Sequence, residues 1–263
     1  MTDSTPEPLG VGKLTGESLS LVFGNLGILL PIAFIPSVLG IVTGYLVNGP
    51  VSLNPAAAFL DPLAVAQAQQ QTSPMTMIVA TIFGVILWGF SAAALTRAVY
   101  DIKMSGSASI GNALGTGLKY VVPVILVVLV LYIVGVLASI ALVLPGLYVM
   151  AMWFVIIPAV VVDGAGFGAL GRSSSLTKGY RWPMVGYGVL FILLYVVVFV
   201  VMGGLQFLFA DMGTVGLILA AVASVMTYAF LYCIGSAMAA LAYARLTEIK
   251  EGMSINQIAD VFS

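Results

Sequence analysis

The chain has 263 residues, of which 61% are apolar and 7% are charged, and its mean hydropathy is +1.16. A soluble domain carries about 25% charged residues because they cover its surface, so this composition excludes a soluble enzyme and a nucleic-acid-binding domain. The formal net charge is −1 and histidine is absent, which excludes a histidine-containing catalytic triad and a histidine-ligated metal or haem. The single cysteine, Cys233, excludes an internal disulfide and a cysteine-based zinc site.

Apolar runs along the chain predict an all-α polytopic membrane protein. A helix needs about 20 apolar residues to cross a bilayer core of about 30 Å. The six predicted spans are 27–47, 75–96, 121–144, 147–162, 184–209 and 215–242. Pro145-Gly146 predicts a tight turn between the third and fourth spans, and Pro158 predicts a kink in the short fourth span. We therefore expect a loose tail over 1–9 and one six-helix membrane domain over 10–263.

The basic residues predict the orientation of these spans. With six spans, one side of the membrane holds the N-terminus, the connections 97–120 and 163–183, and the C-terminus. Every Lys and Arg of the chain lies in these segments: Lys13, Arg97, Lys103, Lys119, Arg172, Lys178, Arg181, Arg245 and Lys250. The connections on the opposite side contain acidic residues but no basic one. Because cytoplasmic loops retain positive charge, both termini are predicted to be cytoplasmic.

Three half-polar segments on the predicted cytoplasmic side share a pattern of an apolar residue, glycine, any residue and an apolar residue. They begin at Val11, Ile110 and Phe167, each just before a pair of spans. Such segments are typical of short amphipathic helices that lie in the membrane interface. The pattern predicts three transmembrane hairpins, each preceded by an interfacial helix. The alternative is that any loop entering a membrane has this composition.

Capping signals predict further short helices in the polar segments. Asn54-Pro55 and Asp61-Pro62 each place a capping side chain before a proline, which favours a short helix on the outer surface. A disordered linker is the alternative for this connection. Ser254 and Gln257 form a capping box that predicts a last helix over 255–262.

The sequence contains no constellation typical of an enzyme or a cofactor site. A phosphate-binding loop, a dinucleotide-binding loop and paired acids at metal-ligand spacing are all missing, so no catalytic residue, cofactor or metal ligand is predicted. The predicted spans contain no charged residue near their middle, which disfavours a proton- or ion-coupled transporter. Their hydroxyls and their small residues at four-residue spacing favour close helix packing or a partner interface.

The most suggestive polar cluster lies between the fourth and fifth predicted spans. On a continuous helix, Arg172, Ser175 and Lys178 share one side, and Arg181 continues that row. Three cations beside several hydroxyls at a cytoplasmic surface suit a lipid phosphate. The alternative is an ordinary basic patch that stops translocation. We predict Arg172, Ser175, Lys178 and Arg181 as a lipid-phosphate site.

Three stretches resemble a known family. They are Leu144-Pro145-Gly146-Leu147-Tyr148, then Ile157-Pro158 with Val160-Val161-Val162-Asp163-Gly164, then Ser173-Ser174-Ser175-Leu176-Thr177-Lys178-Gly179. Together they resemble the membrane domain attached to some bacterial glycerophosphoryl diester phosphodiesterases and its stand-alone relatives. Asp163 stands where that family commonly has glutamate, and the catalytic barrel is missing. The resemblance implies a bacterial inner-membrane protein near lipid metabolism, and it gives no basis for assigning phosphodiesterase activity.

These observations predict a non-enzymatic protein of the bacterial inner membrane. We expect a lipid-interacting scaffold or an accessory subunit of a membrane complex. Its expected partners are membrane lipids, anionic ones included, and a membrane-protein partner or a second copy of the chain. The alternative is a carrier or flippase for a phosphate-bearing amphiphile, with Pro31, Pro36 and Pro158 allowing movement.

Overall fold

The computed structural model describes residues 8–53, 61–141, 143–209 and 212–252. Its α-helices are α1 (Val11–Gly24), α2 (Leu26–Asn48), α4 (Pro62–Gln70), α5 (Pro74–Ser105), α6 (Ile110–Ala141), α7 (Val143–Met152), α8 (Ile156–Val162), α9 (Ala169–Thr177), α10 (Arg181–Gln206) and α11 (Gly213–Glu251). Three 3₁₀ helices complete the order: η1 (Gly49–Leu53), η2 (Gly166–Gly168) and η3 (Phe207–Phe209). The described residues contain no strand, so the predicted all-α fold is confirmed.

Five helices are long and apolar enough to cross a membrane. They are Leu26–Leu53, Pro74–Ser105, Ile110–Val134, Arg181–Leu205 and Gly213–Glu251. They contain most or all of five of the six predicted spans. The remaining apolar helix, Gly146–Val162, is shorter. The structure therefore supports a membrane protein with five long apolar helices, and it does not confirm a sixth full span.

The fourth predicted span is broken in two. α7 ends at Met152 and α8 begins at Ile156. Pro158 has no N–H to donate to the carbonyl of Phe154, and its ring clashes with that carbonyl, which favours a break just before α8. The predicted turn at Pro145-Gly146 is wrong, because both residues lie within the first turns of α7. Proline is tolerated there because the first N–H groups of a helix have no partner within it.

The predicted interfacial helices have different outcomes. α1 and α9 are separate short helices, as expected. Gly10 precedes α1 with φ +66°, a left-handed conformation that favours glycine, and Asn25 separates α1 from α2. The segment that begins at Ile110 is not a separate helix, because it continues into the apolar part of α6 without a break. No proline interrupts this segment before Pro123, and its glycines are accommodated within the helix.

The connection between α2 and α5 contains the short helix predicted from its caps. Asp61 accepts a hydrogen bond from the backbone N–H of Ala64 (3.1 Å) and begins α4, so the described part of this connection is helical. Ser73 likewise caps α5 through the N–H of Thr76 (3.1 Å). The Asn54-Pro55 signal and the predicted helix over 255–262 lie outside the described residues. Pro8 and Leu9 of the predicted tail are described, and Leu9 is buried against the core.

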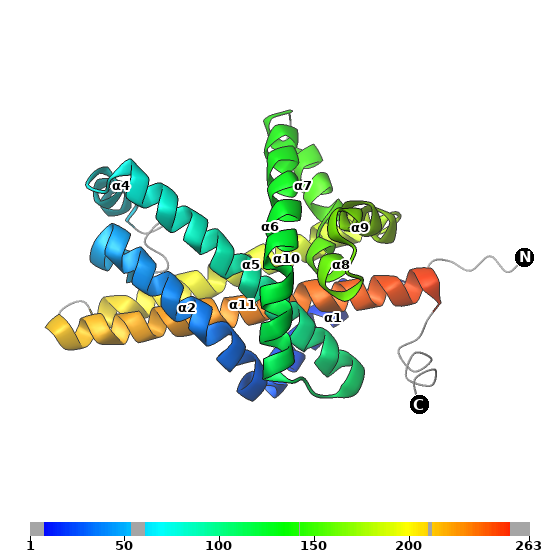
Figure 1. The fold of residues 1–263 in the computed structure, drawn as a ribbon, viewed down its shortest axis with the longest axis horizontal. Helices are drawn as coiled ribbons and strands as arrows, with labels where there is room; N and C mark the ends of the chain where they lie inside the picture. The colour runs from blue at the N-terminus through cyan, green and yellow to red at the C-terminus, as the bar shows by residue number, and fades with distance from the viewer. Residues whose placement is uncertain (1–7, 54–60, 142, 210–211, 253–263) are drawn as a thin grey trace, which may run out of the picture.

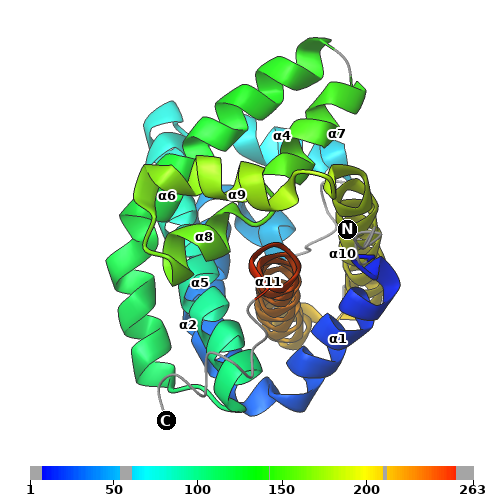
Figure 2. The same ribbon diagram turned by 90° about the vertical axis from the view of Figure 1, so that its right-hand side faces the viewer.

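The long helix α11 lies at the centre of the molecule. Figure 2 looks along α11 and shows α1, α2, α5 and α10 arranged around it. Much of its length is buried, from Ser224 to Leu246. α6 runs across the direction of α11 in both views, and with α7 it projects to one side (Figure 1). A regular set of three parallel hairpins is therefore not confirmed.

Small residues allow α5 and α6 to approach closely where they cross. A Cβ atom at Gly117 of α6 would lie 2.8 Å from the ring of Phe90 and 3.0 Å from the Cβ of Ala94 on α5. A Cβ atom at Gly89 of α5 would lie 3.0 Å from Ile125 on α6. Helices in lipid gain no stability from expelling water between them. Their association therefore depends on the van der Waals contacts that such close packing provides.

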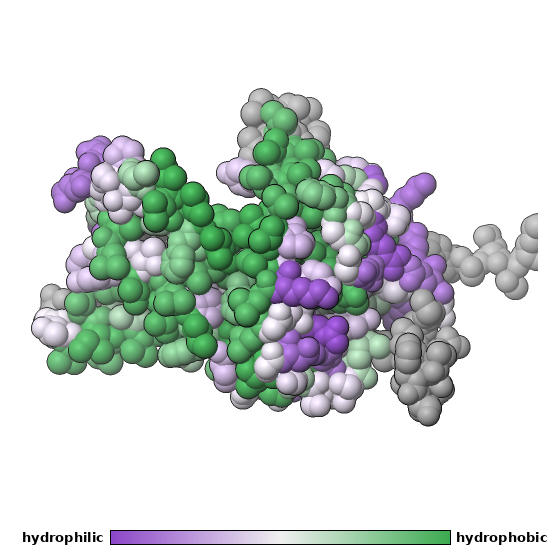
Figure 3. All heavy atoms as spheres, viewed as in Figure 1, coloured by the Kyte–Doolittle hydropathy of each residue, from purple (hydrophilic) through white to green (hydrophobic). Residues whose placement is uncertain are grey.

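The outer surface is strongly asymmetric. Large apolar side chains are exposed along α2, α5, α6, α10 and α11. Figure 3 shows these apolar residues over most of the visible face, while hydrophilic residues gather at the end where α11 finishes and, separately, over α4. Apolar side chains exposed on this scale are typical of a surface that faces lipid.

Candidate functional site

Arg172 lies at the centre of a polar network at the hydrophilic end of the molecule. Its Nε donates a hydrogen bond to Oδ2 of Asp163 (2.8 Å), and its Nη1 forms an ion pair with Glu251. The hydroxyl of Tyr243 donates to the other carboxylate oxygen of Asp163 (2.5 Å). Asp163 follows α8, Arg172 belongs to α9, and Tyr243 and Glu251 belong to α11. The network therefore joins the neighbouring helices α8 and α9 to the distant helix α11.

The charges of this network stabilise one another. The hydrogen bond to Glu251 is the main cause that raises the pKa of the Arg172 guanidinium above its ordinary value. In turn, the hydrogen bond from Arg172 lowers the pKa of Glu251, which lies beyond the apolar stretch 215–242 of α11. All three ionic side chains are less than a third exposed, so water screens them less than an ordinary surface pair. Arg172 already binds two carboxylates in this arrangement.

The expected row of four side chains on one helix is wrong. α9 ends at Thr177, Lys178 has a non-helical backbone, and Gly179 turns the chain with φ +86° before α10 begins at Arg181. Lys178 is exposed, and the hydroxyl of Ser175 donates to the carbonyl of Arg172 one turn earlier (2.9 Å). The glycine supplies a left-handed conformation that ends the helix, so the helical spacing does not continue to Arg181.

Arg181 binds a different set of partners from Arg172. It donates to the hydroxyl of Tyr148 (2.8 Å) and to Oγ of Ser174 (3.3 Å), and its guanidinium lies 5.0 Å from the centre of the Tyr148 ring. These contacts fix the start of α10 against α7 and α9. The structure therefore does not bring Arg172, Ser175, Lys178 and Arg181 together around one point.

Two hydroxyls of the same segment have a structural partner. Ser173 and Thr177 both donate to the backbone carbonyl of Met152, at 2.9 Å and 3.1 Å, and both are buried. Met152 is the last residue of α7, whose final carbonyls lack partners within the helix. The indole N–H of Trp153 also donates to the carbonyl of Leu170 (3.3 Å). α9 thus stabilises the broken end of α7.

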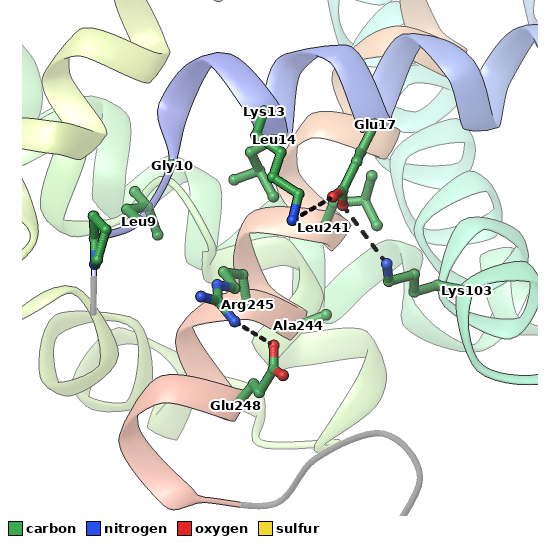
Figure 4. A pocket seen from close by; sticks show the side chains of 11 residues that line it. Leu9, Gly10, Lys13, Leu14, Glu17, Lys103, Leu241, Ala244, Arg245 and Glu248 are labelled. Carbon is green, nitrogen blue, oxygen red and sulfur yellow. Dashed lines mark hydrogen bonds and ion pairs between the residues drawn. The ribbon is translucent and has the colours of Figure 1, made fainter. Parts of the chain in front are cut away.

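A cavity of about 460 Å³ opens at the hydrophilic end between α1, α5 and α11. Figure 4 shows Lys13 and Glu17 entering it from α1, Lys103 from the last turn of α5, and Arg245 and Glu248 from α11. Its remaining lining residues are Pro8, Leu9, Gly10, Leu14, Leu241 and Ala244. The cavity therefore combines three cations and two carboxylates with an apolar wall.

Glu17 is shared between two lysines in this cavity. Its carboxylate oxygens lie 3.9 Å from Nζ of Lys13 and 3.7 Å from Nζ of Lys103. Arg245 pairs with Glu248 at 2.8 Å. The sequence predicted these cations on one side of the membrane, but it gave no signal that Lys13 and Lys103 share Glu17. This sharing depends on how α1 packs beside α11 and α5.

Two further grooves lie between α2 and α5, at the end of these helices far from the cavity. They have volumes of about 260 Å³ and 360 Å³ and open beside α4. Their walls include Gly40, Gly44 and Gly84, together with the hydroxyls of Thr43 and Thr81. No charged side chain of the described residues lines either groove. Asn48 and Gln69 add polar side chains to the 260 Å³ groove, whereas the 360 Å³ groove is lined mainly by apolar side chains and suits an apolar chain.

Comparison with known proteins gives no relative. No family model matches the sequence, and neither a curated protein nor a solved structure matches it. The resemblance to the membrane domain of glycerophosphoryl diester phosphodiesterases therefore stays a prediction.

Proposed function

We propose that the chain is a non-enzymatic integral protein of the bacterial inner membrane that binds phospholipid at its cytoplasmic end, as a scaffold or an accessory subunit of a membrane complex. The observation that carries this proposal is the asymmetry of the surface. Long helices expose apolar side chains to the bilayer, and one end gathers cations around a cavity with an apolar wall. Cations at the membrane surface attract the phosphates of anionic lipids.

The proposal includes six crossings, with α7 and α8 together as a broken fourth crossing and both termini in the cytoplasm. Gly10 before α1 and Glu248 near the end of α11 line the same cavity, which supports an even number of crossings. The placement of all basic residues on the cytoplasmic side of this arrangement supports the orientation.

Labelling of single cysteines tests this topology. In a Cys233→Ser background, Gln70→Cys on α4 and Lys178→Cys after α9 each place a thiol at an exposed position. A membrane-impermeant maleimide should label position 70 in intact spheroplasts and position 178 only after permeabilisation. The reverse pattern would invert the orientation, and labelling of both positions in intact spheroplasts would contradict the three crossings proposed between α4 and the end of α9.

Native mass spectrometry of the protein, gently extracted from its own membrane, tests the function. We expect the 27.4 kDa chain to retain phospholipid, a second polypeptide at fixed stoichiometry, or both. Retained phospholipid indicates a lipid-binding scaffold, and a fixed second polypeptide indicates an accessory subunit. A bare, lipid-free monomer would count against the proposal.

A carrier for a phosphate-bearing amphiphile is the second candidate, and the grooves between α2 and α5 favour it. Pro31 and Pro36 lie inside α2, where each removes a backbone hydrogen bond and favours bending. In a carrier, the grooves would receive the apolar chains at the end of the molecule opposite the basic cavity. Movement of labelled phospholipid between the leaflets of vesicles that contain the purified protein would favour carriage over a scaffold, and its absence would count against a carrier.

A further inference from the structure

Two lysines at the mouth of the cavity share a single carboxylate. Lys13 comes from α1 and Lys103 from the last turn of α5, and both approach Glu17 at 3.7–3.9 Å. These separations are longer than the 2.7–2.9 Å of a well-formed charge-assisted hydrogen bond. Each ammonium has three N–H donors, so one loosely placed carboxylate leaves donors available. The pair therefore has a local excess of one positive charge.

The wall beside this pair is apolar. Leu14 of α1 and Leu241 and Ala244 of α11 line the cavity and are buried or nearly so. Leu9 adds a further apolar side chain next to Gly10. A small hydrophilic anion would gain nothing from these residues, whereas the glycerol backbone and first methylenes of a lipid would be shielded from water by them.

The side chains differ in how freely they can move. The Lys13 side chain is 84% exposed, while those of Lys103 and Glu17 are 34% and 40% exposed. Lys13 can therefore swing over a bound group at little cost, and Lys103 supplies a more fixed contact. An incoming phosphate would take the place that the Glu17 carboxylate now holds between the two ammonium groups.

We propose that this cavity binds the phosphate ester of an anionic phospholipid headgroup, held by Lys13 and Lys103 in competition with Glu17. This inference rests on the proposed lipid-binding function and names its site. Removal of the two lysines should therefore lower the affinity for the lipid, and removal of the Glu17 carboxylate should raise it.

The test is a lipid titration of the full-length protein in detergent after delipidation, followed by native mass spectrometry. Each lysine beside an anionic headgroup contributes about a fivefold change in affinity, so the Lys13→Gln, Lys103→Gln double variant should bind phosphatidylglycerol about 25-fold more weakly. Glu17→Gln should bind it about fivefold more tightly, because the competing carboxylate is lost. Phosphatidylcholine, whose own cation neutralises its phosphate, should show much smaller changes in both variants.

A matched control removes the same charge from the same end of the molecule. Lys119 and Lys250 are both exposed and lie over the rings of Tyr120 and Tyr180, outside the cavity. The Lys119→Gln, Lys250→Gln double variant should bind phosphatidylglycerol within about twofold of the parent protein. Equal losses in the two double variants, or weaker binding by Glu17→Gln, would overturn the assignment of this cavity.

A soluble probe distinguishes a lipid from a free phosphate ester. Glycerol phosphate carries the same phosphate without acyl chains, and it should not bind at concentrations that saturate the protein with phosphatidylglycerol. Equal binding of glycerol phosphate would overturn the lipid assignment and leave a site for soluble phosphate esters. Failure of the parent protein to bind any phospholipid would overturn the proposed function itself, whereas binding that ignores Lys13 and Lys103 would overturn only this site.

Discussion

Replacement of Gly117 by leucine should lower the free energy of unfolding by about 3 kcal/mol, near the upper end of the cost of overpacking. The crossing of α5 and α6 leaves no room for a side chain there. A Cβ atom would already lie 2.8 Å from Phe90 and 3.0 Å from Ala94, and Ala94 is fully buried. Phe90 can move only partly aside, so the two helices must separate. Thermal unfolding of the purified protein in detergent, followed by tryptophan fluorescence, measures the change.

Gly115 provides the control for this substitution on the same helix. A Cβ atom at Gly115 meets nothing within 4 Å, and the residue is exposed. Gly115→Leu should leave stability unchanged or raise it by up to about 1 kcal/mol, because leucine favours the helix more than glycine does. If both substitutions destabilise the protein equally, the close contact of α5 and α6 is not what Gly117 provides.

Replacement of Arg172 by alanine should cost about 2–3 kcal/mol, the usual range for loss of a hydrogen-bonded charge from a partly buried network. Asp163 and Glu251 would then both lose the cation that pairs with them. Lys178→Gln is the matched control, since it removes one exposed positive charge just after the same helix. It should change stability by less than about 0.5 kcal/mol. A similar loss in both variants would mean that general charge, and not the network, stabilises this end.

The pH dependence of stability provides a second readout for Arg172. Because Arg172 lowers the pKa of Glu251, this carboxylate stabilises the folded state above its ordinary pKa of about 4.3, and the contribution is lost as the pH falls through the lowered value. The parent protein should therefore lose stability as the pH falls below about 5 and on through the lowered pKa of Glu251, while Arg172→Ala should show a flatter profile. Parallel profiles would indicate that the ion pair contributes nothing.

The apolar runs predicted much of the architecture because lipid exposure demands long helices with apolar surfaces. Five of the six predicted spans lie largely within the long apolar helices. The sequence also signalled the break in the fourth run through Pro158, although the tight turn was assigned to Pro145-Gly146 instead. The direction in which α6 crosses α11 depends on packing between distant segments, which hydropathy does not encode.

The polar site was predictable only in its composition. The cluster around Arg172 was identified, but the turn at Gly179 separates Arg172 from Arg181 and gives each its own partners. The sharing of Glu17 by Lys13 and Lys103 has no local signal, because ninety residues of chain separate the two lysines and no helical spacing connects them. Gly179, just after α9, is a helix-ending signal in the sequence. It argues against a continuous helix from Arg172 to Arg181.

The short helix α9 is held on two faces at once. Ser173 and Thr177 fasten it to the broken end of α7, and Arg172 fastens it to Asp163 and Glu251. Because α9 is a short helix with contacts to both groups, a movement of one group is transmitted to the other. Any tilt of α7 within the bilayer must shift the ion pairs at the surface, and any rearrangement at the end of α11 must pull on the break between α7 and α8. The interior and the water-exposed end of this protein are therefore mechanically linked through nine residues.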